Sequence, residues 1–160
     1  MAMGTAVQKA VADGITVMGF GDLFLEEIRR YRETQLLGTG LTPLFPIWGL
    51  STLLLAREMV SEGLRARITC VDPKQISASF AGREFDDALL TDLPASADPC
   101  GERGEFHTFA YAGPMFRHSV PIQTGEIVTR DGFVFADLRE VIIASSGLEE
   151  SSQYEKERNS

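Results

Sequence analysis

Hydrophobic positions in the first half of the chain alternate between continuous strand-like runs and helix-like stripes. Residues 15–20 form an unbroken apolar run with β-branched residues near its start, which predicts a buried strand. Ser51 and Gly63 bracket a run with helical spacing, as a side-chain cap and a glycine stop would. The predicted elements are a helix at 5–13, a strand at 15–20, a helix from Asp22 past Arg32, a strand at 44–47, a helix at 51–62 and a strand at 67–73.

This alternation favours a parallel α/β sheet with right-handed crossovers. Ligands of such sheets bind beyond the carboxyl ends of the strands, so Gly21-Asp22, Trp48-Gly49 and Asp72-Pro73 are expected along one rim. Three strands are few for an open sheet, whose usual size is about five or six. We therefore expect either a further N-terminal segment or a partner that covers the exposed sheet edge.

The pattern changes in the second half of the chain. A helix is expected at 83–93 and a linker at 94–98, followed by β-rich runs at 105–111, 119–130 and 132–143. Asp131-Gly132 between the last two runs predicts a tight hairpin. The predicted organisation is an α/β domain at 1–97, a small and mostly antiparallel β-rich subdomain at 98–146, and a flexible polar tail at 147–160.

The composition excludes several functional classes. The chain carries 15 basic and 23 acidic residues and a formal charge of −8, which argues against a broad contact with nucleic acid. Apolar runs are far shorter than the roughly 20 residues of a membrane span, and no signal peptide is visible, so a cytoplasmic location is expected. Two cysteines form neither a disulfide framework nor a zinc pattern, and no metal site is predicted.

Residues 98–108 concentrate the reactive side chains of the chain. Glu105 and His107 are two apart in a predicted strand, so both are expected on one face, where they could orient reacting groups. Gly101 and Gly104 would let backbone amides approach an anion, with Glu102 and Thr108 beside them. The alternative is a turn followed by a strand with one satisfied histidine. Cys100 has no neighbouring base, which makes it a weak candidate nucleophile.

The predicted rim also allows two interpretations. Gly21-Asp22 could contact a nucleotide or substrate, or Asp22 could simply cap the following helix. Trp48, next to Gly49, could stack on a planar ring or belong to the core. Neither a Walker-type phosphate loop nor a dinucleotide-binding glycine pattern is present in the sequence.

Three ordered blocks resemble the diphthine–ammonia ligase (diphthamide synthetase) family. They are FGDLFLEEIR at 20–29, PLFPIWG at 43–49 and DPCGERGEFHT at 98–108, and the resemblance extends over about 6–138. It implies a Rossmann-like domain of the adenine nucleotide α-hydrolase type with a smaller C-terminal region. It also implies ATP with Mg²⁺, an acyl-adenylate made from a carboxylate, and ammonia as the second substrate. The acyl substrate could be a small molecule or a protein.

The resemblance places Gly21, Asp22, Trp48 and Gly49 on the nucleotide side of the cleft. It places Gly101, Glu102, Gly104 and Thr108 on the substrate side. Individual catalytic roles do not follow from it, and for Glu105 and His107, the candidate catalytic residues, we predict only that they bind or orient the reacting groups. Arg103 stands where the family often has a small or amide residue.

The family's Ser-Gly-Gly-Lys-Asp-Ser phosphate loop is absent from the sequence. We therefore expect a ligase lacking its ATP-phosphate side, working as an oligomer or with a complementing N-terminal half. The alternative is a non-catalytic nucleotide- or metabolite-binding module, or one half of a split enzyme.

Overall fold

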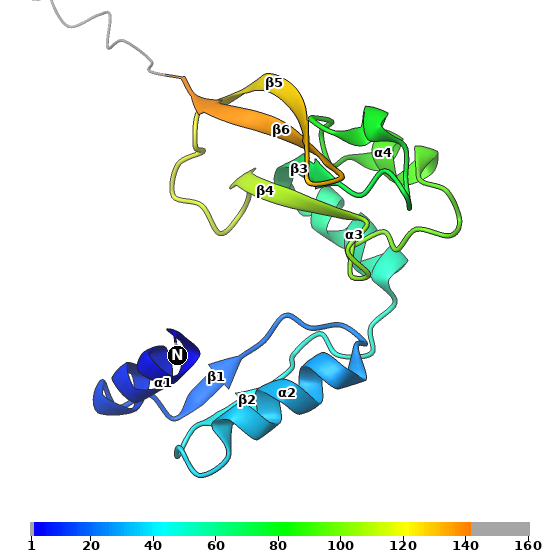
Figure 1. The fold of residues 1–160 in the computed structure, drawn as a ribbon. Helices are drawn as coiled ribbons and strands as arrows, with labels where there is room; N and C mark the ends of the chain where they lie inside the picture. Colours follow the sequence, from blue (N-terminus) through cyan, green and yellow to red (C-terminus); the bar gives the residue numbers. More distant parts are fainter. Residues whose placement is uncertain (1, 142–160) are drawn as a thin grey trace, which may run out of the picture.

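A computed structural model describes residues 2–141 of the chain, and side chains from residue 4 onward. The elements are α1 (Ala2–Ala12), β1 (Val17–Gly19), α2 (Glu26–Leu36), β2 (Thr42–Leu44), α3 (Thr52–Ser61), β3 (Arg65–Val71), η1 (Ala78–Phe80), α4 (Asp87–Asp92), β4 (Phe106–Ala112), β5 (Ile122–Arg130) and β6 (Phe133–Glu140). They form a two-stranded parallel sheet and a four-stranded antiparallel sheet (Figure 1).

The parallel sheet pairs β1 with β2 through the α2 crossover. Val17 lies opposite Thr42 and Gly19 opposite Leu44. A small core of Val7, Leu36 and Leu41 joins α1 and α2 to this sheet. The described chain is therefore α/β here, as the pattern of strands and helices predicted.

The predicted capping role of Asp22 is wrong. Helix α2 begins at Glu26, and the residue at its cap position, Leu25, makes no side-chain capping bond. Glu26 and Glu27 still place two carboxylates in the first turn, where they interact favourably with the helix dipole. Asp22 is thereby left outside the helix, in the segment between β1 and α2.

The third predicted strand is present as β3, but its predicted parallel pairing is wrong. Strand β3 pairs antiparallel with β4 and β6, in the order β4-β3-β6-β5. Its residues alternate between buried and more exposed side chains, with Ala66 and Ile68 buried and Arg65 exposed. This alternation is typical of a half-buried antiparallel strand, whereas parallel strands are usually apolar throughout. Asp72-Pro73 consequently follows a strand of the other sheet and does not share a rim with Gly21-Asp22.

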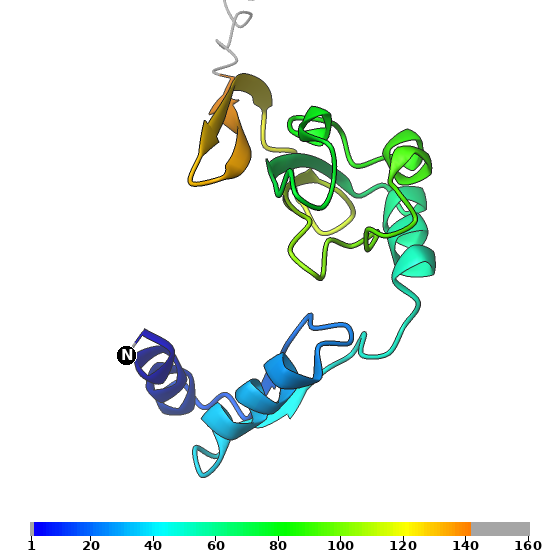
Figure 2. The same ribbon diagram turned by 45° about the vertical axis from the view of Figure 1, so that its right-hand side comes forward.

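One face of the antiparallel sheet packs on helices and forms the main core. Ile68, Phe106 and Val134 from the strands contact buried residues that include Ala56 of α3 and Leu89 of α4. Figure 2 shows α3 and α4 on the same side of this sheet. Stabilisation therefore comes mainly from one face of the sheet.

Local signals set the ends of the elements in this part. Ser51 accepts a hydrogen bond from the Leu54 amide at 3.4 Å and caps α3, as predicted. Asp131 and Gly132 have φ angles of 52° and 84°, the geometry of a tight hairpin turn, so the β5–β6 hairpin prediction is confirmed.

The helix predicted at 83–93 is shorter than expected. The Ile68 amide donates to the Arg83 carbonyl and the Phe85 amide to the Ala66 carbonyl, so this stretch lies along β3. Helix α4 then begins after Asp86, whose side chain accepts a hydrogen bond from the Leu89 amide at 2.8 Å. Pairing with β3 outweighs the helical pattern of residues 83–85.

Two predictions remain untested as stated. The domain boundary near residue 97 stays a prediction, although β3 pairs with strands on its far side. The tail at 147–160 lies outside the described residues. Within residues 2–141, none of the helices combines the length and apolar character needed to span a bilayer.

Leu89→Ala should lower the free energy of unfolding by about 2–5 kcal/mol, because it leaves a cavity in the core. Leu54→Ala is the matched control, since Leu54 lies in α3 with 65% of its surface exposed, and it should change stability by no more than about 0.5 kcal/mol. Urea unfolding followed by circular dichroism measures both. Equal shifts in the two variants would contradict the assigned core.

Candidate functional site

The loop at 98–105 is organised by two buried carboxyl groups. Glu105, 1% exposed, accepts hydrogen bonds from the Asp98 amide at 2.7 Å and the Arg103 amide at 3.0 Å. Asp98, 6% exposed, accepts from the amides of Cys100 at 2.9 Å and Glu102 at 3.4 Å. Amide donors thus satisfy both buried acids, as buried polar groups require. The loop has a defined shape that presents Glu102 and Arg103 outward.

A glycine is required at one position of this loop. Gly101 has a φ of 69°, and a Cβ atom there would lie 2.7 Å from the Phe106 carbonyl oxygen. A side chain at this position would therefore be strained and would also clash with the backbone. The glycine serves to close the loop.

This loop contacts the segment that follows β1. Glu102 Oε1 accepts a hydrogen bond from the Leu23 amide at 3.0 Å. The Leu23 carbonyl in turn accepts one from the Gly49 amide at 2.8 Å. The Arg103 guanidinium lies 5.5 Å from the centre of the Phe24 ring. Three segments far apart in the sequence therefore meet at one junction, around 21–24, Gly49 and 102–103.

Aromatic rings and two arginines line the N-terminal side of this junction. The rings of Phe20 and Phe45 stack with centres 5.4 Å apart, and Phe45 meets Trp48 edge-on at 6.0 Å. The Arg29 guanidinium lies 4.8 Å from the Phe45 ring centre and 4.7 Å from that of Trp48. Arg32 lies 5.2 Å from the Phe20 ring centre. These contacts build a surface suited to a planar, electron-rich group.

Asp22 and Arg32 have unused hydrogen-bonding capacity beside these rings. Asp22 Oδ2 and Arg32 Nε form an ion pair at 3.7 Å, a separation too long for a hydrogen bond. Both atoms are buried and have no hydrogen-bond partner. A buried acceptor and a buried donor without partners are rare in folded proteins. The pair could receive complementary groups of a ligand.

Sequence reasoning did not identify the two arginines or the two phenylalanines as parts of this site. A signal was present, because Arg29 and Arg32 are three residues apart and share one face of α2. The burial of Glu105, and the bonding of the Glu102 and Glu105 side chains to backbone amides, left no comparable signal in the sequence.

Glu105 and His107 are not brought together. Phe106 is 3% exposed and points into the core, whereas His107 is exposed on the opposite face of β4. Glu105 is 1% exposed, so the expected placement of Glu105 and His107 on one face of a strand is not found. Glu105 precedes the strand, and both of its oxygens accept loop amides. Within residues 2–141, no hydrogen bond or ion pair joins the two side chains. Their catalytic roles, and that of exposed Thr108, stay predictions.

Comparison with known proteins agrees with the sequence blocks. The family model of the diphthamide synthase C-terminal domain matches residues 51–141, more than half of the chain. The chain belongs to the diphthamide synthase C-terminal domain family.

Similarity to known full-length proteins covers more of the chain than the family model does. The diphthine–ammonia ligase of Rattus norvegicus is 26% identical over 149 residues, which cover 89% of this chain and 54% of the relative. The diphthine–ammonia ligases of Bos taurus and Homo sapiens are each 28% identical over 139 residues, covering 81% of this chain and 49% of the relative. The chain thus spans about half the length of these relatives.

The family domain contains the loop at 98–105, whereas the aromatic rings and arginines lie before residue 51. The hydrogen bond from the Leu23 amide to Glu102 therefore joins the family domain to the preceding α/β segment. In the described part of the chain, no three His, Cys, Asp or Glu side chains cluster closely enough to hold a metal ion.

Cys100 of the family domain is poorly suited to nucleophilic catalysis. Burial, with the nearby charges of Asp98 and Glu102, raises the pKa of its thiol to about 11. The Sγ atom donates a hydrogen bond to the Thr52 carbonyl at 3.3 Å. The reactive thiolate is therefore scarce at neutral pH.

Glu105→Gln should lower the free energy of unfolding by about 1–3 kcal/mol, because the new amide group would face one of two backbone donors. Glu58→Gln, on the exposed surface of α3, is the control and should have little effect. Urea titration gives both values. A Glu105→Gln variant as stable as the control would refute the structural role of this carboxyl group.

At pH 8, Cys100 should react with iodoacetamide roughly 100-fold more slowly in the folded protein than in urea, because a pKa raised from 9.0 to about 11 lowers the thiolate fraction by that factor. The difference should shrink as the pH rises above 9. Peptide mass spectrometry distinguishes Cys100 from Cys70. Similar rates in the folded and unfolded states would show that the thiol is not protected.

Proposed function

We propose that this chain forms the substrate-side part of an ATP-dependent amide ligase of the diphthine–ammonia ligase type. The observation that carries the proposal is the hydrogen bond from the Leu23 amide to Glu102, which joins two of the sequence blocks that resemble the family. Membership of the diphthamide synthase C-terminal domain family supports it. So do relatives whose names specify diphthine and ammonia.

The proposed reaction has two steps. A carboxylate oxygen of the acyl substrate attacks the α-phosphorus of ATP, and pyrophosphate leaves with the electrons of the broken phosphoanhydride bond. Ammonia then attacks the acyl carbon of the acyl-adenylate, loses a proton and displaces AMP, which leaves the amide. The identity of the carboxylate, small molecule or protein, follows from neither the fold nor the site. A cytoplasmic location also stays a prediction.

The residues of the junction suit the adenosine part of ATP. Trp48 and Phe45 offer ring faces and edges for a purine. Asp22 Oδ2 would accept a hydrogen bond from a ligand donor, and Arg32 Nε would donate one to a ligand acceptor. We assign Gly21 and Gly49 to the same nucleotide side, and Gly101, Glu102 and Gly104 to the substrate side, where Glu102 fixes the position of Leu23.

The phosphates and Mg²⁺ are not matched by residues of this chain. The 160-residue sequence contains no Ser-Gly-Gly-Lys-Asp-Ser loop. No acidic cluster suited to a cation is present in residues 2–141. We infer that the phosphate-binding loop is supplied by another polypeptide segment, and no step is assigned here to the metal.

A further polypeptide segment would also complete the parallel sheet. We propose that β1, α2 and β2 belong to a larger Rossmann-like parallel sheet of the adenine nucleotide α-hydrolase type. Two parallel strands joined by a helix are the repeating unit of such sheets. Val17, 49% exposed, and Leu44, 53% exposed, would be covered by the additional strands.

Adenosine monophosphate should quench the fluorescence of Trp48, the single tryptophan of the chain. Asp22→Ala should weaken its binding about 10- to 100-fold, the range expected when a buried charged hydrogen-bond partner is lost. Asp87→Ala, at an exposed aspartate of α4, is the matched control and should leave the affinity unchanged. Fluorescence titration gives the three dissociation constants.

Absence of quenching, or equal weakening by the two substitutions, would refute the nucleotide site.

Pyrophosphate release from ATP tests whether the phosphate-binding loop comes from another polypeptide segment. It should be undetectable with this chain alone and appear when a polypeptide carrying the phosphate loop, together with ammonium and the carboxylate, is added. Sustained turnover by the chain alone would overturn the inferred second segment, and nucleotide binding that never leads to turnover would favour a non-catalytic module.

A further inference from the structure

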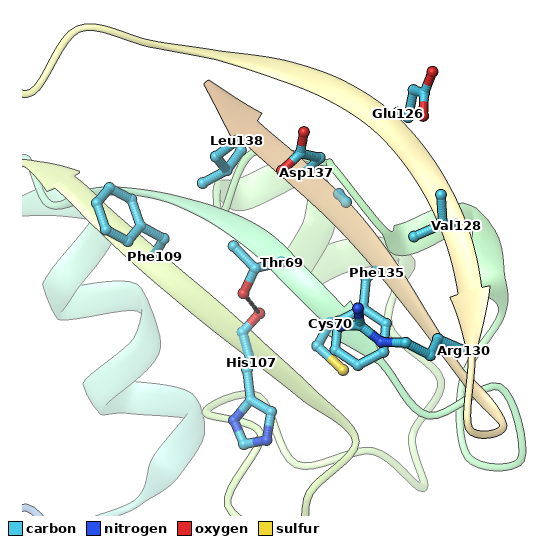
Figure 3. Close-up of a pocket in the computed structure, with 11 residues that line it drawn as sticks. Thr69, Cys70, His107, Phe109, Glu126, Val128, Arg130, Phe135, Asp137 and Leu138 are labelled. Carbon is cyan, nitrogen blue, oxygen red and sulfur yellow. Dashed lines mark hydrogen bonds between the residues drawn. The ribbon is translucent and has the colours of Figure 1, made fainter. Parts of the chain in front are cut away.

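The outer face of the antiparallel sheet contains a hollow of about 620 Å³. Thr69, His107, Phe109, Phe135 and Asp137 line it and alternate along their strands with the core residues of the opposite face. The hollow therefore lies on the side of the sheet turned away from α3 and α4. Its volume is in the range of small-molecule sites, about 300–1,000 Å³. We call it the sheet hollow; Figure 3 shows its lining.

The middle of the sheet hollow is apolar. Phe109, Val128, Phe135 and Leu138 line it from three strands, and Phe109 and Val128 remain 41% and 42% exposed. Cys70 adds a neutral wall, since burial raises the pKa of its thiol. Exposed apolar side chains that converge in one concavity favour a bound organic group over water.

One end of the sheet hollow carries unpaired donors. The Arg130 guanidinium lies 4.7 Å from the Phe135 ring centre and, in the described part of the chain, has no ion-pair or hydrogen-bond partner. His107 lines the same end, and its imidazole ring has no such partner among residues 2–141 either. A guanidinium held over a ring but not neutralised suits a planar anion such as a carboxylate.

The acidic groups lie at the other end. Asp137 is paired with Arg139 at 3.2 Å, so its charge is largely balanced. Glu126 has no partner in the described residues, and it is four residues from Arg130 in β5, about 13 Å at the usual strand rise. The sheet hollow is therefore polarised along β5, and an anionic ligand would enter in one orientation.

We propose that the sheet hollow binds a small organic anion with a flat or branched apolar body, whose anionic group meets Arg130 and His107 and whose body covers Phe109, Val128 and Leu138. This site is distinct from the junction of 21–24, Gly49 and 102–103 and does not depend on the proposed ligase reaction. The net charge of −8 disfavours a polyanion in its place, because among residues 2–141 only one unpaired guanidinium, that of Arg130, lines the sheet hollow.

The test uses a pair of fluorescent probes that differ in charge. 1-Anilinonaphthalene-8-sulfonate carries an anion on an aromatic body, and N-phenyl-1-naphthylamine has nearly the same body without it. Arg130→Gln should weaken binding of the anionic probe at least about fivefold, as loss of one charge-assisted contact predicts, and leave the neutral probe nearly unaffected. Arg117→Gln, at an exposed arginine outside the sheet hollow, is the matched control and should change neither affinity.

A second variant guards against a trivial loss of folding. Val128→Glu places a negative charge on an exposed strand position, so it should repel the anionic probe without altering the urea midpoint by more than a surface substitution does. Anionic-probe affinities unchanged in both Arg130→Gln and Val128→Glu would overturn the proposal. So would equal losses for the two probes in Arg130→Gln, because the anion would then contribute nothing.

Discussion

The arrangement of this protein depends on one buried carboxyl group, that of Glu105. Its two oxygens accept amides from both ends of the loop that precedes β4, and this fixes the turn from which Glu102 reaches the Leu23 amide. The neighbouring buried Asp98 likewise accepts hydrogen bonds from loop amides, those of Cys100 and Glu102. Buried acids are costly unless donors surround them, so these two residues specify a single loop conformation. The acids of the most reactive-looking stretch therefore act first as structural groups.

This constraint links the two sheets of the molecule. The aromatic rings, the arginines and Asp22 lie on α2 and in the segments that follow β1 and β2, while the antiparallel sheet belongs to the family domain. Glu102 joins them through a backbone amide, which any residue at position 23 except proline would also supply. Such a contact fixes position without requiring a particular side chain on the N-terminal side.

Local signals in the sequence predicted local structure well. The Ser51 cap and the Asp131-Gly132 hairpin follow from short-range rules, and both are confirmed. The family resemblance is confirmed as well. Long-range pairing was predicted poorly, because the alternation of β3 was assigned to a parallel strand. Its partners lie more than thirty positions away, beyond the reach of any periodicity.

In the candidate site, too, contacts between segments distant in the sequence were not predicted. Sequence proximity grouped Glu105 with His107, but the carboxyl group turns to the loop backbone and the imidazole to the opposite sheet face. Arg29 and Arg32 are three residues apart on α2, but their stacking depends on rings from the segments that follow β1 and β2. The direction of a side chain determines which groups it can meet in the site. This direction depends on contacts between distant segments, which no local sequence pattern encodes.

The central claim is that the loop at 98–105 and the segment after β1 form one site through Glu102. Amide hydrogen exchange measured by NMR tests it most directly. The Leu23 amide should be protected in the native protein and lose that protection in Glu102→Ala, while the Phe20 amide, which donates to the Leu44 carbonyl at 2.8 Å, should keep its protection. A Leu23 amide that exchanges freely in the native protein, or is equally protected in the variant, would contradict the account.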